Sequence, residues 1–186
     1  MTVRTTMAHL IAQVRQMTNT KVGSAYAGLV TDSEVQRCLD DTRTLLSLYE
    51  LSPVERIAPG GAITRVQWEC PWGDWEDTVL LQSGSGWTAL TPTVSDLMTG
   101  SWTLATSQTS SVYLSGVSYD RYEAAASVLD TVMASGELYT FNFGSGGEQF
   151  SRETIRRNYQ EQAKTYRQMA RPRITQIVRA DDTGAG

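Results

Sequence analysis

The chain has 186 residues, a formal net charge of −4, two cysteines and a single histidine. Its hydrophobic content of 40% and charged content of 19% exclude global disorder and allow a buried core. No apolar run of about eighteen residues predicts a transmembrane helix, and the polar residues within MTVRTTMAHLIAQVRQM exclude a signal peptide. The widely separated Cys38 and Cys70 are typical of a chain made in a reducing cytoplasm.

Two amphipathic helices are predicted in residues 1–50. The first spans about 5–18, where apolar side chains recur at helical spacing. The second begins at the capping box TDSE, formed by Thr31 and Glu34, with Val30 as part of a hydrophobic staple. The apolar stripes consist of Met7, Leu10, Ile11, Val14 and Met17 in the first helix, and of Val35, Cys38, Leu39 and Leu46 in the second.

Residues 51–117 lack the helical periodicity of residues 1–50 and contain short apolar runs between Gly- and Pro-rich turns. The runs AITRVQWEC, DTVLLQ, GWTAL, GSWTLAT and SVYLSG predict antiparallel strands. All five tryptophans lie in this region, where they can fill a small core, face a partner subunit or stack on sugars. Trp72, Trp75 and Trp87 are the candidates for an interface of this β insert.

Two more helices are predicted after the insert. The third begins with Ser118 as its N-cap, and the fourth runs from Ser151 to about Ala170, before Pro172 prevents continuation. Three consecutive alanines, 124–126, favour the close approach of another helix. Packing within or between subunits is assigned to Tyr122, Ala125, Leu129, Tyr159 and Tyr166.

The elements together predict an α+β fold in which a four-helix core carries an antiparallel β-rich insert. Residues 1–50 and 118–170 form the helical core, and residues 51–117 form the insert. Residues 171–186 form an extended basic tail.

Charge is divided unevenly along the chain. Residues 1–151 hold eight basic and sixteen acidic side chains, net −8, and residues 152–186 hold eight basic and four acidic ones, net +4. The basic segment is either a solvated helix face with a frayed end or an arm that reaches a partner. The β-branched stretch PRITQIV can add as a strand to another chain's sheet, with its arginines binding acids or phosphates.

Few side chains indicate a catalytic or metal-binding site. Asp74, Glu76 and Asp77 lack the ligand spacing of a calcium loop, so a solvated turn is favoured. Glu69 and Glu76 offer a carboxylate pair for sugar hydrolysis as an alternative, and His9 has no evident partner nucleophile. We predict no catalytic residue, cofactor or metal site, and no enzyme. The alternative to a structural role is a carbohydrate- or receptor-binding module that uses the tryptophans.

The order and spacing of several segments resemble a known family. These segments are LIAQVRQMTN, TDSEVQRCLDDTR, PWGDWEDTVLLQ, LTPTVSDLMTGSWTLAT, SYDRYEAAASVLD, FNFGSGGEQFSR and YRQMARPR. Together they resemble the head-to-tail adaptor, or connector, proteins of long-tailed double-stranded DNA phages and gene-transfer particles. The resemblance spans about 8–175, and no single motif in it is diagnostic.

The resemblance implies a structural virion protein, made in the host cytoplasm and located in the neck. Such adaptors form a ring, typically dodecameric, that extends the DNA channel between the portal and a stopper or tail-terminator protein. DNA passes through without sequence-specific binding, and no membrane is involved. The C-terminal end reaches the portal, which assigns docking to Arg171, Pro172, Arg173, Ile174, Ile177 and Arg179.

Overall fold

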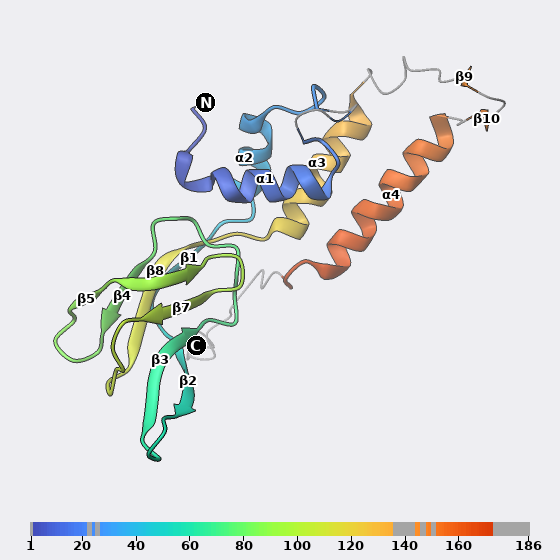
Figure 1. The fold of residues 1–186 in the computed structure, drawn as a ribbon. Coiled ribbons are helices and arrows are strands. Elements are labelled where there is room, and N and C mark those ends of the chain that lie inside the picture. The colour runs from blue at the N-terminus through green and yellow to red at the C-terminus, as the bar shows by residue number, and fades with distance from the viewer. Residues whose placement is uncertain are drawn as a thin grey trace, which may run out of the picture.

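The chain forms a β-rich α+β fold (Figure 1). The computed structural model describes residues 2–21, 24, 27–135, 144–145, 148–149 and 152–172. This part contains four α-helices and two four-stranded antiparallel sheets. The predicted four-helix core with a β insert is therefore wrong, because the sheets are a layer of their own with a separate core rather than an appendage of a helical bundle.

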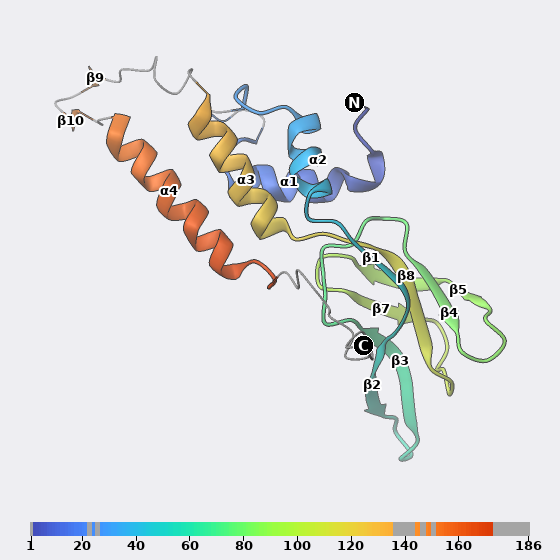
Figure 2. The same cartoon turned by 180° about the vertical axis from the view of Figure 1, so that it is seen from behind.

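The helices form one layer at one end of the molecule (Figure 2). A single 3₁₀ turn, Thr5–Met7, leads into the first helix. The α-helices are α1 (Ala8–Met17), α2 (Asp32–Asp40), α3 (Arg121–Ala134) and α4 (Arg152–Met169). Their positions agree with the four periodic segments of the sequence, although the ends of α2 and α3 differ.

Helix α2 starts where the sequence predicts and ends earlier. The capping box is confirmed, since the Thr31 hydroxyl accepts from the Glu34 amide and the Glu34 carboxylate accepts from the Thr31 amide. The helix stops at Asp40, where the main-chain N–H and the hydroxyl of Thr42 both donate to the Leu39 carbonyl. Leu46, predicted on the helical stripe, lies instead in a strand, because 44–50 finds a pairing partner in β8.

Helix α3 begins two residues later than predicted. Asp120 is its N-cap and accepts hydrogen bonds from the amides of Tyr122 and Glu123. The predicted cap, Ser118, is the last residue of β8, and its hydroxyl donates to the Gly73 carbonyl. Because Ser118 belongs to β8, Asp120 takes the N-cap position two residues later.

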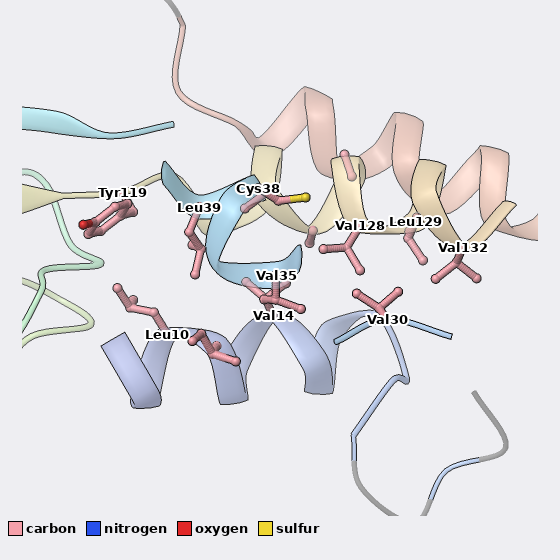
Figure 3. Packing of buried hydrophobic residues seen from close by; sticks show 14 of the residues in the cluster. Leu10, Val14, Val30, Val35, Cys38, Leu39, Tyr119, Val128, Leu129 and Val132 are labelled. Carbon is pink, nitrogen blue, oxygen red and sulfur yellow. The ribbon is translucent and has the colours of Figure 1, made fainter. Parts of the chain in front are cut away.

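The helical core consists mainly of aliphatic side chains and receives residues from all four α-helices (Figure 3). Leu10 and Val14 of α1 face Val35 of α2, and Val128 of α3 closes the cluster from the other side. The alanines at 124–126 are fully buried, as expected for a close helix approach. Helix α4 runs along α3 on its outer side.

The two sheets contain all the longer strands of the described chain. The first sheet has the order β1 (Thr44–Glu50), β8 (Val112–Ser118), β4 (Leu80–Ser83) and β5 (Ala89–Leu90). The second has the order β2 (Ser52–Ile57), β3 (Ile63–Glu69), β7 (Ser101–Leu104) and β6 (Pro92–Asp96). A separate pair joins β9 (Gly144–Ser145) to β10 (Glu148–Gln149).

The sheets enclose a second core rich in tryptophan, and we refer to them together as the β-sandwich. Trp68 of β3 lies opposite Trp102 of β7, and both are buried. Trp75 meets Trp102 edge-on at 5.9 Å between ring centroids. Leu81 and Leu114, paired in the first sheet, cover the cluster from the other side. Filling a small core is therefore the main role of these indoles.

Candidate functional site

The helical layer and the β-sandwich meet at a junction built largely from charged side chains. Two loops enter it, 73–77 before β4 and 119–120 between β8 and α3. The start of the chain and the end of α4 also reach it, through Arg4 and Arg171. The junction therefore brings together the segment that begins the chain and the one that leads into the predicted arm.

Arg171 anchors the end of α4 to the junction. Its guanidinium donates from Nη1 to the Ser118 Oγ and from Nη2 to the Gly73 carbonyl, each at 2.8 Å. Its main-chain N–H donates to the Asp120 Oδ2 at 2.5 Å. Three hydrogen bonds therefore fix the position of Arg171 at the junction.

Asp74 lies beneath this anchor, with only 6% of its surface exposed. Arg121 approaches its carboxylate at 3.1 Å and Arg171 at 3.7 Å. Burial raises the pKa of Asp74, although the two arginines act in the opposite direction. Gly73 must be a glycine, because a Cβ there would lie 1.9 Å from the Met98 carbonyl oxygen. The tight loop thus places a carboxylate between two cations.

Glu76 forms the second half of the junction. It accepts hydrogen bonds from the Thr6 hydroxyl at 2.5 Å and the Tyr119 hydroxyl at 2.7 Å, and the Arg4 Nε lies 3.8 Å away. Burial alone would raise the pKa of Glu76, but these partners lower it below its ordinary value. Burial and the Glu76 carboxylate raise the pKa of Tyr119, which keeps it a donor. Arg4 also pairs with Asp40.

The carboxylates and the histidine singled out in the sequence have different surroundings in the structure. Asp74 faces arginines, Glu76 faces hydroxyl groups, and Asp77 is exposed, so the three do not converge. Within the described residues no three His, Cys, Asp or Glu side chains are placed to hold a metal ion. Glu69 lies exposed on β3 and accepts from Gln67. His9 Nε2 lies 2.9 Å from the Trp75 carbonyl oxygen, which is a structural contact.

The predicted interface tryptophans differ in accessibility. Trp75 is fully buried and donates from Nε1 to the Trp72 carbonyl, so it contributes to no surface of the folded chain. Trp72 is half-buried against Tyr49. Trp87 remains, with 53% of its surface exposed. Of the three predicted interface tryptophans, Trp87 is thus the most exposed.

The predicted helix-packing residues all lie on α3 or α4. Ala125 and Leu129 are fully buried on α3, and Tyr159 is buried on α4. The rings of Tyr122 and Tyr166 lie 6.3 Å apart, and the Tyr166 hydroxyl donates to the Met17 carbonyl. These side chains hold α4 to its own body.

The outer side of α4 is polar and basic. Arg156, Arg157 and Lys164 are exposed, and Arg157 pairs with Glu161 one turn on at 3.1 Å. Arg167 pairs with Asp130 of α3. Of the predicted portal-docking residues, Arg171 and Pro172 are described. Arg173, Ile174, Ile177 and Arg179 lie outside the described residues.

Comparisons with known proteins identify no relative. No family model, no curated protein and no solved structure matches the chain. In the part of the chain that the structure describes, no helix combines the length and apolar character needed to cross a membrane.

Proposed function

We propose that this chain is a structural virion protein that forms an adaptor ring between a portal and the next neck or tail component. The proposal continues the resemblance carried by the sequence segments given above. The C-terminal segment docks on the portal, and the ring, typically dodecameric, extends the channel through which DNA passes. The chain does no chemistry of its own.

The observation that carries the proposal is the anchoring of Arg171. An arm that reaches a partner needs a fixed origin, since a loose origin raises the entropy cost of docking. Bonds to Ser118, Gly73 and Asp120 provide that origin at the junction. Residues 173–186, if fully extended, would span about 46–50 Å at about 3.3–3.6 Å per residue.

Charge distribution supports the same role. The body carries net −8 over residues 1–151, and the segment from 152 carries net +4. A ring subunit needs two unlike, complementary faces, and opposite charges provide one means of complementarity. An acidic body also neutralises few phosphates, so it releases few counterions from DNA that passes it.

Truncation after Pro172 tests the proposal. We expect the shortened chain to keep its far-UV circular dichroism spectrum and thermal transition, because Arg171 and the whole of α4 remain. It should lose co-purification with the portal protein of the same particle. Arg157→Ala, which removes an exposed basic side chain from α4, serves as the control and should retain binding.

Two outcomes would contradict the docking assignment. One is a truncated chain that enters portal complexes at the full-length level. The other is equal loss of binding in the truncated chain and in Arg157→Ala, which would indicate nonspecific attraction by basic charge.

A further inference from the structure

Apart from Val94 of β6, the exposed large apolar side chains of the β-sandwich lie in two places of unlike shape. The first is the tip of the hairpin formed by β2 and β3. Ile57 and Ile63 lie opposite each other in register and are 79% and 59% exposed. The turn between them contains Gly60 and Gly61, both at positive φ, and residues 57–63 include no charged side chain. The tip is thus a narrow apolar protrusion.

The hairpin tip projects away from the rest of its own chain. In both views it lies at the end of the molecule opposite the helices, beyond the first sheet (Figures 1 and 2). Ile57 and Ile63 accordingly stay largely exposed beside the other described residues. A side chain of this size gains most from burial against another apolar surface.

The second place is the outer face of the first sheet. Leu81 and Leu114 mark the inner face, so Leu80, paired with Ser115, points outward. Leu45 shares that side through its pairing with Val117. Trp87 lies beside it through a tilted ring contact with Tyr113, whose centroid is 5.3 Å away. The exposed fractions are 45% for Leu80, 69% for Leu45 and 53% for Trp87.

The outer face is broad where the hairpin tip is narrow. It extends across three strands, from the edge strand β1 through β8 to β4. Leu48, 47% exposed, lies at the irregularity of β1 between Leu46 and Tyr49. A narrow protrusion and a broad face on the same chain suit a head-to-tail contact between copies. In such a contact the hairpin tip of one copy lies on the outer face of the next copy.

Charges beside the two surfaces are complementary. Arg56 precedes Ile57 in the hairpin and donates to the Gln67 side chain, without an ion pair among the described residues. Glu50 of β1, paired with Tyr113, accepts from the Ser111 hydroxyl and likewise has no cation beside it in the described chain. A tip placed on the face of another copy can bring Arg56 toward Glu50, which favours this partner over a tip-to-tip contact.

We propose that the β2–β3 hairpin tip of one copy docks on the outer face of the first sheet of the next copy. Ile57 and Ile63 bury against Leu45, Leu80 and Trp87, and Arg56 faces Glu50. The contact itself does not depend on the adaptor role proposed above. Only the closure of repeated contacts into a ring rests on that role, because head-to-tail contacts form a ring when the rotation between copies allows it.

Cysteine trapping tests this contact in the full-length chain. Ile57→Cys and Leu80→Cys are prepared separately, mixed, and exposed to oxidised glutathione, while the native Cys38 and Cys70 are buried. We expect a disulfide-linked heterodimer to form about tenfold faster than with Ile57→Cys mixed with Met169→Cys, because docking raises the effective concentration of the two thiols. Met169 is 57% exposed on α4 and provides the matched control.

Equal rates for the two mixtures would overturn the proposal. Faster coupling of Ile57→Cys to itself than to Leu80→Cys would also overturn it, by indicating a tip-to-tip contact. Arg56→Glu and Glu50→Arg, introduced on opposite members of the trapped pair, should each slow trapping singly and restore it in combination. No effect of either single change would contradict the charge pairing.

The two proposals fail separately. If Ile57→Cys and Leu80→Cys form no disulfide faster than the control pair while the chain still binds the portal, only the hairpin contact is rejected. Trapping without any portal association would reject the adaptor role and leave the contact between copies standing.

Discussion

The helical layer and the β-sandwich have cores of different amino-acid composition. The helical core uses mainly aliphatic residues and alanines, drawn from four separated stretches of the chain. The sandwich core uses tryptophans and leucines drawn from residues 51–114. Backbones approach closely in the first core, whereas a few large rings fill the space between sheets in the second.

Their outer surfaces differ as well. Of the eight large hydrophobic side chains that are exposed in the described chain, seven lie in residues 45–94 and only Met169 lies on a helix. Exposed apolar patches mark interaction sites more often than chance exposure of single residues does. Within the described residues, exposed large apolar side chains are therefore concentrated on the β-sandwich, the region to which we assign the proposed contact between copies.

The largest expected effect comes from removing the centre of the sandwich core. Trp75→Ala should lower the free energy of unfolding by about 3–5 kcal/mol, because the cavity left by a fully buried indole is not refilled. Urea denaturation followed by circular dichroism measures the change. Trp87→Ala, at an exposed position, should stay within about 0.5 kcal/mol of the wild type. Similar losses in both variants would contradict the assignment of Trp75 to the core.

The junction couples the helical layer to the β-sandwich. Glu76→Gln weakens the acceptor shared by Thr6 and Tyr119 and should cost about 1–3 kcal/mol at neutral pH. The pKa of Glu76 is lowered in the folded chain, so its stabilising contribution is complete above the unfolded value of about 4.3. It is lost as the pH falls through the lower folded pKa.

The difference between wild type and Glu76→Gln should therefore shrink toward acid pH. Denaturation curves collected from neutral to acid pH measure this, with the exposed Glu69→Gln as control. A difference that stays constant with pH would contradict the role of an ionised Glu76. Two separate unfolding transitions in the variant would show that the junction joins the layers into one cooperative unit.

The smallest effect is expected within the helical layer alone. Thr31→Ala removes one half of the capping box and should lower stability by about 1 kcal/mol. Thr31→Ser keeps the hydroxyl and should restore most of the loss. Thermal melts of the three proteins provide the measurement, and equal stability of the alanine and wild-type chains would argue against the cap.

Local features of the sequence determined most of the helices. The spacing of Leu10 and Val14, the capping box at Thr31 and the alanines at 124–126 all had the expected structural result, because helix periodicity and caps act within a few residues. The strands around Trp68, Leu81, Trp102 and Leu114 were likewise visible in short apolar runs bounded by turns.

Tertiary structure decided what local patterns left open. Residues 44–50 became a strand because β8 offers them an antiparallel partner far along the chain. No local signal assigns Arg171 to Ser118, or Glu76 to Thr6, since those bonds exist only once the helical layer and the β-sandwich meet. Nor could composition tell the buried Trp75 from the exposed Trp87, because burial depends on which face of which sheet each ring reaches.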